Sequence, residues 1–359
     1  MANTYAWDNE IASTTKDIFL MTTKKLADNV TKYSPFANIF LGGKTGDGKL
    51  VARRKPKRQI GGKQLLVPLR YGHSATVQTV GEGETVQPVK IKGIGHATFN
   101  WKYAIGHTVI TWQDKQQNSG AAQVVSMVND LMDDLKTAFV EKIDTMLVSD
   151  GTGNGGKDML GLAAFIERDP TSSTLGGISK ANNTWWRNWY WNAIPGASSF
   201  NSAFATSNQG LKDMLYMWLA CGYKSKGAGS SFEKPDFCAC SLNNYAAYEI
   251  IARDLKRYNE IAGEANLGFD TLKFKNTKLF YVPALDDGPN GSNVSKQMWF
   301  NTKHLYMIID PNYYFKGIPW ENLGKNQPMD DVAYTTLVGQ MVCDNLSRLG
   351  YLEWTSDTN

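Results

Sequence analysis

The chain has 359 residues, of which 42% are hydrophobic and 20% are charged. These proportions are those of a globular protein with a large core in two or more lobes, and they exclude a disordered or fibrous chain. A formal charge of only +4 gives no general support for nucleic-acid binding, because dedicated binders are strongly basic.

The first part of the chain predicts an arm followed by a protruding hairpin. Residues 8–30 have the apolar spacing of one or two short amphipathic helices, which we interpret as an arm. Residues 44–70 are rich in glycine, proline and basic side chains and contain nothing that builds a core. The alternation and turn glycines that follow extend this segment into a long β-loop over about 50–92.

A strand and a long helix are predicted next. Apolar residues alternate with polar ones from Ala97 to Ile105, which indicates a strand with one buried face that includes Tyr103 and Ile105. Apolar side chains then recur at spacings of three and four, which predicts a helix over about 119–148. The glycine-rich sequence at 150–156 ends it.

The remainder reads as mixed α/β structure. A helix is predicted over 208–220, with Leu211, Met214, Leu215 and Trp218 on one face, and a second over 242–254. Strands are predicted within 272–285 and 296–310. Two further β-runs close the chain within 333–354, and a turn at 344–348 separates them.

The sequence WWRNWYW at 185–191 gathers four tryptophans and a tyrosine. Such rings suit a stacking platform for bases or sugars, a membrane-interface belt or a packing anchor. We expect neither a signal peptide nor a membrane span, since no apolar run is long enough, and this removes the membrane reading. We favour packing within the protein, with Trp185 over Trp189 and Trp186 over Tyr190 on a short helix.

No catalytic, cofactor or metal site is predicted. The four cysteines form no CxxC pair and are expected to be buried free thiols, and the four histidines are scattered. Gly43, Lys44 and Thr45 imitate the end of a phosphate-binding loop, but Asn38 stands where its first glycine belongs. The glycines at 150–156 follow a helix and not a strand, and no GxSxG sequence occurs. We therefore expect a protein that is not an enzyme.

The basic run at 53–70 has two interpretations. It is either a contact with a nucleic-acid backbone or a charged segment that lies on a neighbouring subunit. Stacking recognition of single strands is disfavoured because no aromatic residue interrupts the run before Tyr71.

The order of these parts resembles the major capsid proteins of tailed bacteriophages, whose fold was first described for the Hong Kong phage head. The stretch from Gly161 to Trp189 is similar to one branch of that family, with a Gly-Leu opening, a Gly-Gly-Ile turn and a tryptophan-rich segment. The closing sequence VGQMVCDNLSRLG is similar to the same branch. The resemblance in the order of the parts extends over nearly the whole chain, whereas the two sequence motifs extend over about forty residues.

The resemblance implies an α+β fold with a particular division of the chain. This division is an N-terminal arm (1–48), an extended β-hairpin loop (49–95), a peripheral domain (96–165 with 325–359) that includes a spine helix (118–149), and an axial domain (166–324). The tryptophans would then be the packing anchor between lobes: Trp185, Trp186, Trp189 and Trp191.

The resemblance also implies self-assembly into pentamers and hexamers that enclose double-stranded DNA in a phage head. Further implied partners are a separate scaffolding protein, a portal and a decoration protein; the location is the virion, after assembly in the bacterial cytoplasm. Some relatives crosslink a loop lysine, a position that Lys63 would match, but nothing identifies its asparagine partner. The basic side chains expected at contacts between subunits are Arg53, Arg54, Lys55, Lys57, Arg58, Lys63, Lys224 and Lys226. Two alternatives are an encapsulin-type shell and a nucleic-acid or carbohydrate-binding module that uses the tryptophan-rich segment.

Overall fold

The computed structural model of the chain divides into two compact units, each built from segments far apart in the sequence. Unit 1 contains Tyr103–Ile143 and Asn312–Val338, and unit 2 contains Pro35–Lys102, Asp144–Pro311 and Gly339–Asn359. The structure describes residues 36, 38–42, 56–72, 79–85, 93–117, 127–192, 209–223, 233–254, 272–285, 295–322 and 329–354.

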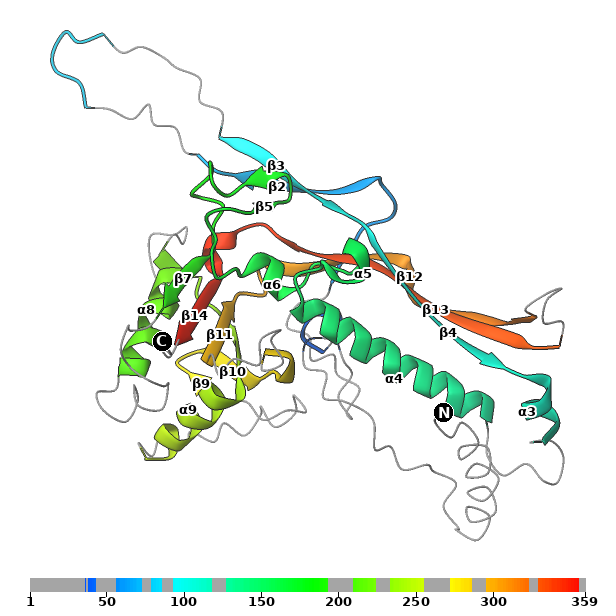
Figure 1. The fold of residues 1–359 in the computed structure, drawn as a ribbon. Helices are drawn as coiled ribbons and strands as arrows, with labels where there is room; N and C mark the ends of the chain where they lie inside the picture. The colour runs from blue at the N-terminus through cyan, green and yellow to red at the C-terminus, as the bar shows by residue number, and fades with distance from the viewer. Residues whose placement is uncertain are drawn as a thin grey trace. The chain divides into compact units, whose positions relative to one another are not determined.

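The chain contains both helices and strands, which occur partly in runs of one kind (Figure 1). In order they are η1 (Asn38–Gly42), β1 (Lys57–Arg58), β2 (Gln64–Arg70), β3 (Ile94–Asn100), β4 (Lys102–Ile110), α3 (Trp112–Gln117), α4 (Met127–Val148), α5 (Gly153–Gly156), α6 (Leu162–Phe165), β5 (Thr174–Leu175), β6 (Ile178–Ser179), β7 (Trp189–Asn192), α8 (Gln209–Tyr223), β8 (Phe237–Cys240), α9 (Leu242–Asp254), β9 (Leu272–Phe274), β10 (Thr277–Tyr281), η4 (Pro283–Leu285), β11 (Ser295–Phe300), β12 (Leu305–Asn322), β13 (Asp331–Cys343), η5 (Leu346–Arg348) and β14 (Gly350–Trp354).

In unit 1, the helix α4 packs on strands. Leu135 and Phe139 of α4 each come within 3.0 Å of the position that a side chain on Gly106 of β4 would occupy. The Phe139 ring also meets Phe315 of β12 edge to face, with ring centroids 5.8 Å apart. The long helix predicted from the three-and-four spacing is therefore present over Met127–Val148, and the first residues of the prediction lie outside the described ones.

The prediction for the strand at 97–105 is wrong in its second half. The backbone divides into β3 and β4 at Trp101, and Tyr103 and Ile105 are 69% and 65% exposed. The reason lies in α4, which covers the even-numbered face of β4 at Gly106, where the missing side chain leaves room for the helix. A period of two shows that a strand has two faces, but not which face a helix will cover.

Unit 2 is organised around a six-stranded sheet in the order β7-β14-β11-β8-β10-β9. β7 runs parallel to β14 and β8 parallel to β10, whereas β11 is antiparallel to both of its neighbours. α8 and α9 cover one face and share a core with the strands. That core includes Met214, Trp218, Tyr248, Trp299 and Leu352.

The opposite face of this sheet is covered by the segment that contains η1. Phe36 packs against Phe280 with ring centroids 5.4 Å apart, and Phe40 stacks on Phe300 at 5.9 Å. Both of these phenylalanines of the predicted arm are buried. The end of the arm therefore belongs to the core of its own chain, a role that the sequence analysis did not foresee.

The predicted hairpin is present, with β2 antiparallel to β3 from Gln64–Asn100 to Arg70–Ile94. Its base does build a core, contrary to the prediction: Leu65, Val67 and Leu69 alternate with exposed residues and are buried. The turn between β5 and β6 lies against this base, since the Thr98 amide donates to the Gly176 carbonyl at 2.9 Å. Gly176 and Gly177 have φ of +61° and +77°, as the two-residue turn of a tight hairpin requires.

The closing segment has the two predicted strands and the predicted turn. β13 ends at Cys343, η5 follows, and the Asn345 side chain caps the turn by accepting hydrogen bonds from the Ser347 amide and hydroxyl. The two strands enter different sheets, because β14 joins the six-stranded sheet while β13 lies in a four-stranded sheet of order β1-β12-β13-β4.

Candidate assembly interface

Of the basic residues predicted to contact other subunits, the structure describes Lys57, Arg58 and Lys63, which lie at the root of the hairpin. Lys57 and Arg58 form β1, which pairs in parallel with β12 at the edge of the four-stranded sheet. The Lys57 ammonium stands 3.7 Å from the centroid of the Tyr306 ring, and both basic side chains are exposed. Lys63 is exposed in the loop that precedes β2. The other predicted residues lie outside the described ranges: Arg53, Arg54, Lys55, Lys224 and Lys226.

The far end of the hairpin carries the opposite charge. In the described turn at 79–85, Glu82 and Glu84 are exposed and Val80 is 51% exposed. The Glu84 carboxylate accepts a hydrogen bond from the Gly81 amide at 2.8 Å, which shapes the turn. The hairpin is therefore acidic at its turn and basic at its root, a distribution that suits head-to-tail contact between copies.

The tryptophan-rich segment does not form the predicted helix. Trp189–Asn192 is strand β7, held beside β14 by the bond from the Trp189 amide to the Leu349 carbonyl at 2.9 Å. The indole of Trp186 is 1% exposed and donates to the Leu175 carbonyl at 3.0 Å. A long-range strand pairing has thus overridden the local i,i+4 pattern.

The remaining rings of this segment contact different parts of unit 2. Trp185 stacks on Tyr71 at the end of the hairpin strands, with ring centroids 5.2 Å apart. The Trp189 indole donates to the Ser347 carbonyl at 3.0 Å. Trp191, by contrast, is 47% exposed. Of the four tryptophans, only Trp191 leaves a large part of its ring open to a further partner.

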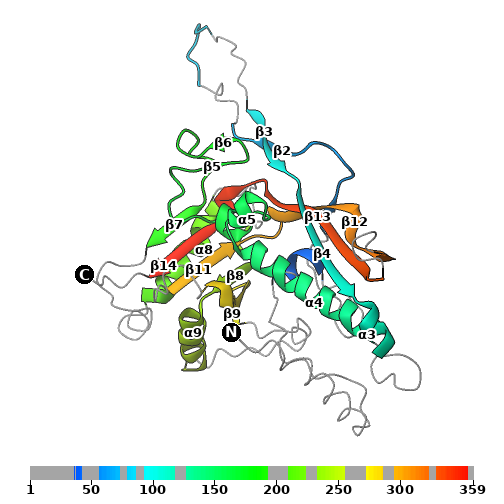
Figure 2. The same ribbon diagram turned by 45° about the vertical axis from the view of Figure 1, so that its right-hand side comes forward.

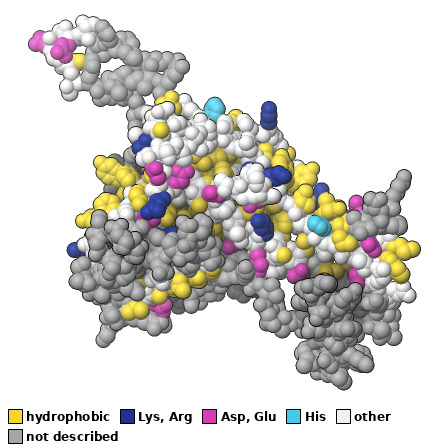
Figure 3. Space-filling model, viewed as in Figure 1, with side chains coloured by type: hydrophobic (Ala, Val, Ile, Leu, Met, Phe, Trp, Pro, Cys, Tyr) yellow, Lys and Arg dark blue, Asp and Glu magenta, His cyan; other side chains and the backbone are white. Residues whose placement is uncertain are grey.

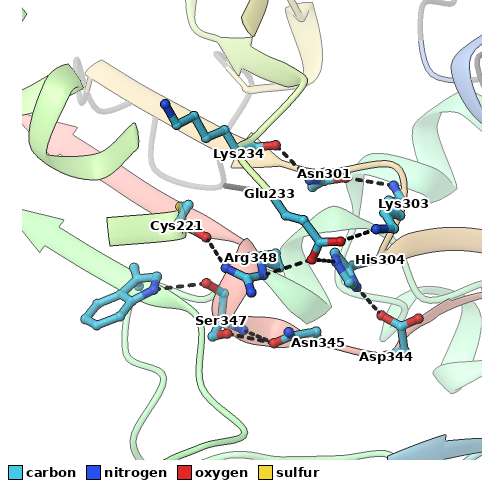
Figure 4. A network of polar contacts seen from close by, with 11 residues as sticks. Cys221, Glu233, Lys234, Asn301, Lys303, His304, Asp344, Asn345, Ser347 and Arg348 are labelled. Carbon is cyan, nitrogen blue, oxygen red and sulfur yellow. Dashed lines mark hydrogen bonds and ion pairs between the residues drawn. The ribbon is translucent and has the colours of Figure 1, made fainter. Parts of the chain in front are cut away.

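A polar network that the sequence analysis missed lies at the end of β13 (Figure 4). One ring nitrogen of His304 lies 2.6 Å from the Asp344 carboxylate, and the other lies 2.9 Å from Glu233. Lys303 also pairs with Glu233, and the buried Arg348 guanidinium lies 3.8 Å from it. These residues are scattered over 116 positions of the sequence, so no local motif reveals them.

The charges of this network depend on one another. Burial raises the pKa of Glu233, but hydrogen bonds and charges from Lys303 and His304 outweigh it, so the net pKa lies below its ordinary value of 4.5. The Arg348 guanidinium also donates to the Cys221 carbonyl at 3.0 Å and so ties η5 to the end of α8.

His304 connects two carboxylates of this network. Both ring nitrogens of His304 face carboxylates, and none of the contacts places a serine hydroxyl or a thiol beside the ring. Cys221 contributes its backbone carbonyl, and burial raises the pKa of its thiol well above the ordinary value. The geometry is that of a structural cross-link between segments.

The prediction of buried free thiols is confirmed, since Cys221, Cys238, Cys240 and Cys343 are all free and buried. Across the residues that the structure describes, no three His, Cys, Asp or Glu side chains gather as metal ligands would. The helices in the same residues include none that is long and apolar enough to cross a membrane. The Gly43-Lys44-Thr45 sequence lies outside the described residues.

Comparison with solved structures defines the fold class: the chain has the capsid fold of tailed bacteriophages, as the resemblance predicted. The capsid protein of cyanophage A-1(L) is similar over 93% of this chain and 97% of its own, with 15% identity and a TM-score of 0.59. That of Myoviridae phage XM1 is similar over 93% and 96%, with 9% identity and a TM-score of 0.56. The SrpI encapsulin of Synechococcus elongatus is similar over 96% of each chain, with 8% identity and a TM-score of 0.53. No family model matches the sequence, and no curated protein does.

Proposed function

We propose that this protein is the major capsid protein of a tailed phage, which assembles into pentamers and hexamers that form an icosahedral head around double-stranded DNA. The observation that carries this proposal is the likeness of fold to the cyanophage A-1(L) capsid protein over nearly the whole of both chains.

Exposed apolar side chains support assembly independently of the comparison. Ile60, Leu66 and Ile94 at the hairpin are 73%, 58% and 69% exposed. In unit 1, Tyr103 and Ile105 leave an apolar face of β4 open. Large exposed apolar side chains on neighbouring positions mark surfaces that other proteins cover.

The division into arm, extended loop, peripheral domain and axial domain is part of the same proposal. So are a separate scaffolding protein, a portal and a decoration protein as partners, together with assembly in the bacterial cytoplasm and a final place in the virion. The basic root of the hairpin would pair with acidic side chains on a neighbour, and Glu82 and Glu84 at its turn have the matching charge.

Charge reversal tests the assembly role of the basic run that begins at Arg53. The variant Arg53→Glu, Arg54→Glu, Lys57→Glu should remain a soluble, folded subunit by circular dichroism, yet form no shells by negative-stain microscopy. A matched control reverses three exposed lysines on separate elements, Lys136, Lys157 and Lys316, and should form shells. Normal shells from the first variant, or equal failure of both, would contradict a specific role for the basic run.

An encapsulin-type shell is the second candidate, because the SrpI encapsulin has a similar fold. The contents of purified particles separate the two candidates. Nuclease-resistant double-stranded DNA is expected for a phage head, whereas a second protein species without DNA would favour the encapsulin.

A further inference from the structure

The outer face of α8 is apolar. Tyr216, Leu219 and Tyr223 are 54%, 50% and 78% exposed, and their spacing of three and four places them on one side of the helix. Trp191 of the adjoining strand β7 extends this surface, with its ring centroid 6.2 Å from that of Tyr216. We call these four residues the α8 patch. Figure 3 shows hydrophobic side chains at the surface on the side where β7 and α8 lie.

The inner face of the same helix is apolar as well. Met214, Met217 and Trp218 are buried against the six-stranded sheet. A helix that lies on a protein surface normally keeps one apolar stripe and a polar outer face. The sheet covers only the inner side of α8. We therefore expect another protein surface to cover the apolar outer side.

A second apolar stripe lies on α9. Leu242 and Ile250 are 53% and 61% exposed, and Ala246 is exposed midway between them at a spacing of four. We call these three residues the α9 patch. The inner side of α9 is again part of the shared core, through Ala247 and Tyr248.

The two patches lie on helices that cover different parts of one sheet. α8 packs on β14 and β7, and β7 is the first strand of the sheet order. α9 packs on β11 and β10, which lie farther along that order, and its Tyr248 hydroxyl donates to the Lys273 carbonyl of β9, the last strand, at 2.7 Å. Figures 1 and 2 both show α8 beside β7 and α9 beside β9.

Two different patches on separate helices suit a ring. A two-fold contact needs one patch that fits itself, whereas a closed ring needs two patches that fit each other head to tail. We propose that the α8 patch of one copy packs against the α9 patch of the next copy around each pentamer or hexamer. This inference rests on the proposed capsid function and assigns the surfaces that close its rings.

The charges around the patches favour an antiparallel crossing of the two helices. Lys212 is exposed one turn before Tyr216, at the start of α8, and Glu249 stands beside Ile250 in the second half of α9. With the helices antiparallel and Tyr223 opposite Leu242, Lys212 lies little more than one helical turn from the level of Glu249, which its long side chain can span. Opposite charges at the rim of an apolar contact fix its register.

The size of the patches indicates a weak contact. A half-exposed large side chain leaves on the order of 100 Å² open, so the α8 patch offers about 400 Å². With a similar area on the partner, the pair buries about 800 Å², which is below the roughly 1,200 Å² of a stable two-protein complex. A contact of this size is too weak to hold two copies together alone. It is stable when the same copies make other contacts at the same time, as they do in a shell.

Cysteine pairs test the head-to-tail contact. We would make Tyr216→Cys with Ile250→Cys, Leu219→Cys with Ala246→Cys, and Tyr223→Cys with Leu242→Cys, because a disulfide requires Cα atoms within about 7 Å. All six positions are exposed, so these substitutions should leave folding intact. The native cysteines are buried and should give no background.

Oxidised particles of at least one pair should give a ladder on a non-reducing gel that ends at a covalent pentamer or hexamer. Each single-cysteine variant is the control and should give no ladder. A dimer from Leu219→Cys alone would show that α8 pairs with itself, and the inference would be wrong. Absence of a ladder from all three pairs, in particles seen by microscopy, would also overturn it while leaving the capsid function standing. Failure of the wild-type chain to form particles would instead count against the proposed function.

Discussion

Among the glycines that the structure describes, Gly161 is the one at which an added methyl group should do the most damage, because backbone atoms obstruct it. It precedes α6, directly beside the last turns of α4. A Cβ at this residue would stand 2.3 Å from the carbonyl oxygen of Met146 and 2.5 Å from that of Leu147. Ordinary van der Waals contact begins at about 3.5 Å, so the Gly161→Ala variant has to open this contact by about 1 Å.

The cost is high because the obstructing atoms belong to the backbone. Side chains escape an overlap by rotating, whereas the Met146 carbonyl is held in α4 and also accepts the Ser149 hydroxyl at 2.9 Å. Overpacking of a core costs about 1 to 3 kcal/mol, and a rigid obstruction places this variant at about 3 kcal/mol. For a domain of about 150 to 250 residues, that free energy lowers Tm by roughly 6 to 12 °C.

Calorimetry of the unassembled subunit measures this shift. The matched control is Gly317→Ala in β12, where an added Cβ meets no atom within 4 Å and the free energy of unfolding should change by less than about 0.5 kcal/mol. Equal melting temperatures for Gly161→Ala and the wild type would refute the close approach of residue 161 to α4.

Three further predictions concern the core and the polar network. Trp186→Ala should lower the free energy of unfolding by about 3 to 5 kcal/mol in urea titration, because the ring is buried and hydrogen-bonded, whereas the half-exposed Trp191→Ala should cost far less. The lowered pKa of Glu233 contributes stability that is present above pH 4.5 and is lost as pH falls through the folded-state pKa. Glu233→Gln should therefore destabilise the subunit at pH 7 and flatten the decline of Tm below pH 4.5, while Asp133→Asn, in an exposed pair with Lys136, should leave the pH profile unchanged. Burial raises the pKa of Cys221, Cys238 and Cys343, so a thiol reagent at pH 7 should label none of the four cysteines in the native subunit and all four in urea; rapid labelling of the native subunit would contradict their burial.

Local patterns in the sequence were enough to predict several elements. The three-and-four spacing predicted α4 and α8, with Met214 and Trp218 on the buried side of α8. Turn residues predicted the hairpin and the turn at 344–348. Such patterns are readable because a helix turn or a tight turn is set by residues a few positions apart.

Contacts between distant segments decided the rest. Strand β7 forms from a helix-like tryptophan pattern because β14 pairs with it, and β4 exposes Tyr103 because α4 covers its other face. Glu233, His304 and Arg348 meet only when three segments far apart in the sequence come together. The sequence by itself therefore determined which elements the chain contains and where it turns. The tertiary structure decided which faces are buried and which remain open to other copies, because burial depends on the partner that arrives from elsewhere in the chain.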